Sequence, residues 1–253
     1  MTRNVIVSGG GTGIGRAVAH RFAADGDQVV LIGRRSEVLE KAAAEIAAAT
    51  SAPTPLTCVA DLADAEAAER VAAEVAQLLG QVQVLVAAAG GNAALVAQGG
   101  QIDGVAGAAW HWTENFRINA LTAVLLTEAV RPHLADGARI LLVSSIAAYR
   151  GSGSGSYAGA KAALHPYAYD LAAELGERGI TVNVVAPGYI AGTEFFQGKL
   201  SSDRERMLID QTYTARPGTP VDVAGTVYWL ASPTAGQITA QIIQVNGGAE
   251  RGR

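Results

Sequence analysis

The sequence predicts a single α/β domain, in which a doubly wound, mostly parallel sheet of seven strands carries helices on both faces. Short β-branched runs alternate with longer Ala/Glu-rich stretches of helical periodicity, which is typical of strands joined by helical crossovers. The runs are apolar throughout rather than at every second residue, as expected of strands covered on both faces. No linker or repeat interrupts the 253 residues, a length that one α/β domain reaches.

The expected elements follow one another as strand and helix along the whole chain. β-Branched residues favour the strands, whereas Ala, Glu and Leu favour the helices. The expected strands are residues 4–7, 29–33, 56–60, 82–87, 138–144, 180–185 and 242–245. The expected helices are residues 14–24, 37–49, 65–79, a stretch that includes 112–134, then 156–177, 203–211 and 222–230.

Two local features modify this pattern. Pro166 falls inside the helix expected at 156–177, where it removes a backbone donor and should kink the helix. Residues 189–220 contain aromatic and charged residues but no strand pattern. Because long excursions of this kind often carry function, we expect them to form a lid over a binding site.

The composition argues against several other classes of protein. The net charge of −4 is unlike that of nucleic-acid-binding proteins, although Arg34 and Arg35 form a local basic spot. Cys58 is the only cysteine and the four histidines lack metal-ligand spacing, so neither a disulfide nor a metal site is expected. No apolar stretch is long enough to span a membrane and no signal peptide is visible. We therefore expect a cytoplasmic protein that binds neither nucleic acid nor membrane.

A glycine-rich loop occupies residues 8–15, which read SGGGTGIG. The loop follows the first strand and opens the first helix, the context that a dinucleotide-binding loop of the Rossmann type requires. Gly9 permits the tight turn, while Gly13 and Gly15 allow close packing. The N–H groups at the start of the helix then face a pyrophosphate. The alternative is a plain glycine turn without a ligand.

The end of the second expected strand bears on the choice between NAD and NADP. NAD sites usually place a carboxylate at this point to hold the ribose hydroxyls. This chain has Gly33-Arg34-Arg35 instead, and guanidinium groups bind a phosphate through bidentate hydrogen bonds. The sequence therefore predicts NADP(H) rather than NAD(H), with a solvated basic turn as the alternative.

Tyr157 and Lys161 are spaced i, i+4, which places both side chains on one face of a helix. A nearby ammonium group favours a phenolate and lowers the tyrosine pKa, so the pair can exchange a proton near neutral pH. The pair is not specific by itself. Ser144 and Ser145 end the fifth expected strand, at the sheet edge where ligands bind in open α/β folds. Asn119 lies in an earlier helical stretch.

Seven ordered motifs resemble those of the short-chain dehydrogenase/reductase family, nearly from end to end. The chain is identified as similar to the 3-oxoacyl-(acyl carrier protein) reductases and ketoreductases of that family. The motifs are the glycine loop from Ser8-Gly9 to Gly13-Ile14-Gly15, Asp61-Leu62, Ala87-Ala88-Ala89-Gly90, Asn119, the Ser144-Ser145 pair with Tyr157 and Lys161, Pro187-Gly188, and Ile238–Gln241 with Asn246-Gly247-Gly248.

The resemblance implies a role for each matching residue. Tyr157 would be the general acid or base, Lys161 would contact the nicotinamide ribose, the serine would polarise the carbonyl, and Asn119 would hold a water. A homotetramer or homodimer is also implied. The residues that would bind the cofactor are Ser8, Gly9, Thr12, Gly13, Ile14, Gly15, Arg34, Arg35, Asp61, Leu62, Ala89, Gly90, Tyr157, Lys161, Pro187, Gly188, Ile190 and Thr193.

Several positions depart from the family pattern. Ala87 and Ala88 replace two asparagines, and Thr193 lies one position further from the Pro-Gly motif than is common. The usual serine–tyrosine spacing favours Ser144, whereas the strand-end motif favours Ser145. We expect Ser145 to be the catalytic serine.

The expected function is NADPH-dependent hydride transfer to a small ketone or 3-oxoacyl substrate. An alcohol or sugar dehydrogenase that works in the oxidative direction would use the same residues. Two non-enzymatic alternatives are an NADP-sensing protein and a scaffold. The presence of Tyr157, Lys161 and the glycine loop argues against both.

Overall fold

The computed structural model describes residues 2–50, 52–96, 104–196 and 198–251. Within these residues, seven strands form one parallel sheet in the order β3-β2-β1-β4-β5-β6-β7. The predicted fold class and strand number are therefore confirmed. The strands are β1 (Asn4–Ser8), β2 (Gln28–Gly33), β3 (Leu56–Val59), β4 (Val82–Ala87), β5 (Leu134–Val143), β6 (Thr181–Pro187) and β7 (Ile242–Val245).

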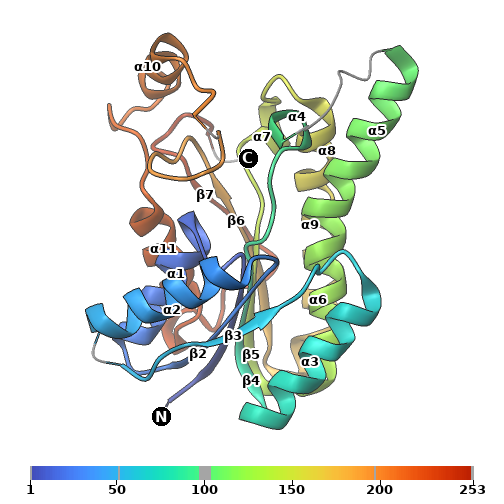
Figure 1. The fold of residues 1–253 in the computed structure, drawn as a ribbon, viewed down its shortest axis with the longest axis vertical. Helices are drawn as coiled ribbons and strands as arrows, with labels where there is room; N and C mark the ends of the chain where they lie inside the picture. The colour runs from blue at the N-terminus through green and yellow to red at the C-terminus, as the bar shows by residue number, and fades with distance from the viewer. Residues whose placement is uncertain (1, 51, 97–103, 197, 252–253) are drawn as a thin grey trace.

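Helices cover both faces of the sheet (Figure 1). On one face pack α1 (Gly13–Ala24), α2 (Ser36–Thr50) and α11 (Pro220–Leu230). On the other face pack α3 (Ala65–Leu79), α6 (Thr122–Val130) and α9 (Leu164–Leu175). Beside these lie α5 (Gly104–Phe116) and α8 (Gly155–Ala162), and the shorter helices are α4 (Ala93–Val96), α7 (Ala147–Arg150) and α10 (Ser202–Asp210).

Alternate residues of each strand pack into two separate hydrophobic cores, one on each face of the sheet. In β1, Val5 and Val7 pack with Phe22 on the α1 face, whereas Ile6 packs with Val71 on the α3 face. Successive side chains of a strand point to opposite faces, so a strand that is covered twice must be apolar at every position. This is why the apolar runs in the sequence are continuous.

The order of the strands places a binding edge between β1 and β4. From β1 the chain builds outward through β2 and β3, then returns to pair β4 against the other side of β1. At such a switch point the loops beyond the carboxyl ends of the strands diverge and leave a crevice. The glycine loop after β1 and the segment after β4 both lie there.

Two boundaries differ from the prediction. The helical stretch expected to include residues 112–134 begins earlier, at Gly104, contains a π-helical turn at Arg117–Leu121, and gives way to β5 at Leu134. Gly104 and Gly107 weaken the helical signal in the sequence. β5 starts before a register shift opposite Val82–Val84, so its first residues lack a regular strand pattern.

Pro166 interrupts the helix that carries Tyr157, as predicted. The helix is divided into α8 and α9 at Ala163. Pro166 has no N–H to donate to the carbonyl of Ala162, and its ring crowds that carbonyl. The break lies beyond Lys161, so Tyr157 and Lys161 stay on one regular turn.

The segment 189–220 lies at the carboxyl ends of the strands, and its helix α10 projects beyond the sheet in Figure 1. A bridge between Ile190 and Gly218 closes the base of this segment. The side chain of Ser201 accepts a hydrogen bond from Arg204 N and so caps α10. Residue 197 is outside the described part of the chain.

The composition also predicts that the chain has no membrane span and no metal site, and both expectations can be examined in the described residues. Among them, the structure has no helix that is both long and apolar enough to cross a bilayer. The same residues contain no cluster of side chains that could hold a metal ion. Cys58 is buried in the core, and burial raises the pKa of its thiol to about 11.

Candidate active site

The glycine loop is held in place by backbone contacts that only glycine allows. Gly9 has a φ of +67° and Gly13 a φ of +50°, in the left-handed region that favours glycine. A Cβ on Gly15 would lie 2.2 Å from the carbonyl oxygen of Gly9. The start of α1 therefore packs directly on the loop, as predicted for a turn that brings backbone close to a ligand.

Ser8 joins the glycine loop to the segment that follows β4. Its hydroxyl accepts hydrogen bonds from the N–H groups of Ala88 and Ala89, both at 3.1 Å. This contact needs only a hydroxyl group at the end of β1. It fixes Ala89 and Gly90 beside the loop although the usual asparagines are absent.

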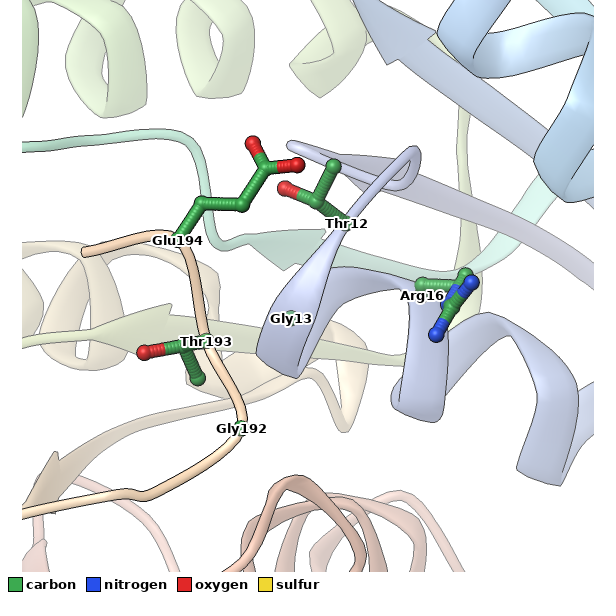
Figure 2. Close-up of a pocket in the computed structure, with 6 residues that line it drawn as sticks. All are labelled: Thr12, Gly13, Arg16, Gly192, Thr193 and Glu194. Carbon is green, nitrogen blue, oxygen red and sulfur yellow. The ribbon is translucent and has the colours of Figure 1, made fainter. Parts of the chain in front are cut away.

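A pocket of about 280 Å³ lies between the glycine loop and residues 192–194. Thr12 precedes α1 in an extended conformation and its side chain makes no capping bond, so the first N–H groups of the helix remain available. Figure 2 shows the side chain of Glu194 extending toward the loop at Thr12, whereas the hydroxyl of Thr193 points away from α1. The free helix end and the close glycine backbone fit the pyrophosphate of a dinucleotide.

The resemblance places Asp61 on the adenine side of the cofactor, and this end of the candidate site is formed where β2 and β3 finish. Arg34 and Arg35 follow β2 and are exposed, and Arg35 Nη2 lies 3.1 Å from Glu194 Oε2. Asp61 follows β3 and accepts hydrogen bonds from Ala63 N at 3.1 Å and Arg117 Nη1 at 3.0 Å. Burial raises the pKa of Asp61, but these hydrogen bonds and the charges of both Arg117 and Arg34 outweigh it and lower the pKa.

The remaining predicted cofactor residues lie at the same edge of the sheet. Leu62 is buried, and its side chain belongs to the core. Pro187 ends β6, and Gly188 approaches Asn246 so closely that a Cβ would lie 2.8 Å from Asn246 Cβ. Ile190 is buried, and Thr193 Oγ1 donates to its carbonyl at 3.3 Å. The segment that carries Thr193 reaches Gly13 despite its shifted spacing.

Tyr157 and Lys161 are both buried on α8. Burial raises the pKa of Tyr157 to about 12, and a side-chain hydrogen bond with Ser145 opposes this rise. Burial lowers the pKa of Lys161 to about 8, and its Nζ donates to the carbonyl of Val143 at 2.9 Å. The expected lowering of the tyrosine pKa by the lysine is therefore not seen in this arrangement, in which desolvation dominates.

The two candidate serines have different surroundings. Ser144 is buried, donates to the carbonyl of Lys161 at 2.9 Å, and lies 2.9 Å from His165 Nε2. Ser145 is partly exposed, accepts a hydrogen bond from Ala147 N at 3.1 Å, and contacts Tyr157. The geometry thus pairs Ser145, the serine favoured by the strand-end motif, with the tyrosine.

Asn119 lies in the π-helical turn and is fully buried. Its amide donates to the carbonyls of Gly91 and Asn115 at 2.7 and 3.0 Å, and its oxygen accepts from Gly91 N at 3.1 Å. A Cβ on Gly90 would lie 2.6 Å from Asn119 Oδ1 and 3.0 Å from Lys161 Nζ. In this structure the Asn119 side chain positions the segment after β4 next to the lysine.

Asn115 is a neighbour of the site that the sequence pattern does not reveal, whereas Phe195 belongs to the aromatic segment 189–220 that is expected to form a lid. Asn115 is fully buried, accepts a hydrogen bond from Ala93 N, and donates to Ser156 Oγ. The Phe195 ring packs against Tyr157 at 5.5 Å between centroids. The position of Asn115 one turn before Asn119 was the only available signal. Nothing in the local pattern indicated the contact of Phe195.

The fold and these residues define a class of protein, an α/β oxidoreductase that binds a dinucleotide. Comparison with known proteins narrows this class. A family model described as enoyl-(acyl carrier protein) reductase matches residues 9–250. The chain is 32% identical over 252 residues to the short-chain reductase protein NovJ of Streptomyces niveus, covering 96% of this chain and 92% of that protein.

Two further likenesses agree with this result. Galactitol 2-dehydrogenase (L-tagatose-forming) of Cereibacter sphaeroides is 33% identical over 247 residues, covering 96% of this chain and 92% of that protein. A short chain dehydrogenase from Burkholderia cenocepacia J2315 in complex with NADP superimposes with a TM-score of 0.84 at 28% identity, over 98% of this chain and 97% of that one. The chain therefore belongs to the short-chain dehydrogenase/reductase family of NAD(P)-dependent oxidoreductases.

Proposed function

We propose that this chain reduces a ketone or 3-oxoacyl carbonyl with NADPH and uses Tyr157 as the general acid. The observation that carries the proposal is the buried contact of Tyr157 with Ser145, one turn from Lys161 and beside the segment that follows β4. These groups lie at the carboxyl edge of the sheet, where the glycine loop also ends. The same residues serve the reverse reaction when Tyr157 acts as a base.

When bound, the nicotinamide supplies the hydride that the carbonyl carbon accepts. The phenol of Tyr157 gives its proton to the carbonyl oxygen, so the product is the neutral alcohol. The Ser145 hydroxyl accepts from Ala147 N and contacts Tyr157, so its single proton would turn from Tyr157 to that oxygen when the substrate binds. Lys161, one turn along α8, would contact the nicotinamide ribose.

The protonation state of Tyr157 fits the role of a proton donor. Burial raises this pKa to about 12, so the phenol carries its proton at neutral pH and is ready to act as an acid. To act as a base, the residue must first lose that proton in a desolvated site. The alternative of an alcohol or sugar dehydrogenase is favoured by the likeness to galactitol 2-dehydrogenase.

The proposed preference for NADPH rests on Arg34 and Arg35. Both are exposed at the end of β2, and the turn offers no carboxylate to a ribose 2′-hydroxyl. Guanidinium groups suit a 2′-phosphate because they form bidentate hydrogen bonds with it. The similarity to a structure in complex with NADP agrees with this assignment.

The proposed lid, residues 189–220, brings aromatic side chains to the catalytic tyrosine. Phe195 contacts Tyr157, and Phe196 contacts both Phe195 and Tyr189. Such a wall suits an apolar or cyclic ketone, and closure over it would exclude water. Good turnover of short polar ketones together with poor turnover of cyclic ones would contradict this substrate class.

We further propose a cytoplasmic homotetramer or homodimer. Trp112 and Phe116 on α5 are 55% and 43% exposed, and large exposed apolar side chains on one helix are a feature of subunit interfaces. Light scattering on the purified protein tests this state. A monomer at micromolar concentration would contradict it.

The function is tested by titrating the protein with NADPH and NADH, then screening ketones, 3-oxoacyl thioesters and secondary alcohols by reduced-nicotinamide absorbance. We expect tighter binding of NADPH and turnover of at least one carbonyl compound. A higher kcat/KM with NADH would refute the cofactor assignment. Binding without turnover across the panel would favour a sensing protein.

A further inference from the structure

A carboxylate of the proposed lid contacts an arginine of the proposed phosphate site. Glu194 Oε2 lies 3.1 Å from Arg35 Nη2, and the two side chains are 64% and 56% exposed. Glu194 also lines the pocket at the start of α1, and Figure 2 shows its carboxylate extending toward the glycine loop. The ion pair therefore joins the lid to the end of β2 across the pocket.

The neighbours of Glu194 in the chain contact the other parts of the site. Thr193 lies against Gly13, with its Cγ2 3.4 Å from the position of a Cβ on that glycine. Phe195 packs on Tyr157. Three consecutive lid residues thus touch the glycine loop, the phosphate site and the catalytic tyrosine.

We propose that Glu194 moderates the preference for NADPH by competing with the 2′-phosphate of NADPH for Arg35. The inference rests on the proposed role of Arg34 and Arg35 in binding that phosphate. The phosphate offers a larger negative charge and more acceptor oxygens than a carboxylate, and the guanidinium fork can bind it in bidentate fashion. The phosphate therefore displaces Glu194 from Arg35.

NADH carries a 2′-hydroxyl at the same place and presents no anion to Arg35. The Glu194–Arg35 pair consequently remains intact when NADH binds, and the lid stays tied to the end of β2. A ligand shifts a conformational equilibrium only through its different affinity for the two states. The 2′-phosphate supplies that difference, so NADPH binding frees Glu194 from Arg35 and NADH binding does not.

The test is the dissociation constant of each cofactor, measured on the full chain by nucleotide fluorescence at low ionic strength. Glu194→Gln keeps the size of the side chain and removes its charge. We expect NADPH to bind about twofold to fivefold more tightly, the range set by an exposed ion pair, and NADH to bind unchanged. The gain should shrink at high salt, where exposed charges are screened.

Two further variants isolate the ion pair from a general charge effect. In an Arg35→Ala background, Glu194→Gln should have no effect on NADPH binding, since the competing partner is gone. Asp203→Asn removes an equal charge from the lid at a side chain that is 92% exposed and pairs only weakly with Arg206, at 3.9 Å. It should leave both affinities unchanged.

The outcomes separate this inference from the proposed function. If Arg35→Ala weakens NADPH binding alone while Glu194→Gln changes nothing, the competition is refuted and the phosphate site stands. Equal gains from Asp203→Asn and Glu194→Gln would also refute the competition. If Arg35→Ala and Arg34→Ala both leave the ratio of NADPH to NADH affinity unchanged, the phosphate site and the competition are both wrong.

Discussion

Ser144 and Ser145 are adjacent in the chain, but their hydroxyl groups serve opposite sides of the strand end. Ser144 Oγ donates to the carbonyl of Lys161 and lies 2.9 Å from His165 Nε2. Since its one proton goes to that carbonyl, His165 is the donor in the second contact. Ser145 instead contacts Tyr157. One serine thus braces α8 and the other faces the reacting groups.

This division predicts different effects of removing each hydroxyl. Ser145→Ala should lower kcat by about 10²-fold, the usual loss of one oriented donor, with cofactor affinity unchanged. Ser144→Ala should change kcat little but lower the free energy of unfolding by about 1–3 kcal/mol, because His165 loses its buried partner. Steady-state kinetics and urea denaturation check both. The reverse pattern would assign catalysis to Ser144.

The buried ammonium of Lys161 predicts a pH-dependent stability. The pKa of this lysine is lowered from 10.5 to about 8 by burial. Between these values the unfolded state binds the proton and the folded state does not, so folding becomes more favourable as pH rises. Lys161→Met should remove this contribution, so the difference in unfolding free energy between the original protein and the variant should change by about 2 kcal/mol between pH 8 and 10. Parallel stability curves for the two proteins would contradict the shift.

Gly15 is expected to tolerate no side chain. A Cβ there would meet the Gly9 carbonyl at 2.2 Å, so Gly15→Ala should lower unfolding free energy by about 2–4 kcal/mol and weaken cofactor binding. Gly225 in α11 is the matched control, because no heavy atom lies within 4 Å of its added Cβ. Gly225→Ala should stabilise the helix by about 0.5–1 kcal/mol. Equal effects in thermal denaturation would refute the close packing.

Arg117 is expected to act on cofactor binding through Asp61. Its Nη1 donates to Asp61 Oδ2 at 3.0 Å, and Arg117→Ala frees that carboxylate. We expect NADPH and NADH to bind about threefold to tenfold more weakly, since one charged hydrogen bond is lost and the adenosine is common to both. Arg178→Ala removes an exposed pair with Asp136 and should change neither affinity. A loss confined to NADPH would place Arg117 at the phosphate instead.

The fold could be predicted because each element has a local signal. Apolar runs marked the buried strands, and the glycine loop marked the first crossover. The start of β5 could not be predicted because Asp136-Gly137, with Gly137 at a φ of +72°, reads as a turn. It is part of a strand only because Leu134 pairs with Val82 across the register shift.

The site was predictable only as a set of segments. The motifs predict that Tyr157, Lys161 and Ser145 belong to one site. In the structure Tyr157 and Lys161 lie on one turn of α8, and Tyr157 contacts Ser145. The pairing of Glu194 with Arg35 joins residues 159 positions apart, and no local pattern specifies such a contact. The pKa of Tyr157 also required the structure, because the i, i+4 spacing predicts an effect of Lys161 but not the larger effect of burial.

The proposed role of Tyr157 as the acid is tested most directly by Tyr157→Phe, with binding and turnover of NADPH measured on the same preparation. Loss of the proton donor should reduce kcat by about 10²–10⁴-fold while the dissociation constant of NADPH changes less than about twofold. Tyr169→Phe, an exposed tyrosine on α9, is the control and should keep full activity. Turnover that survives in Tyr157→Phe would contradict the account.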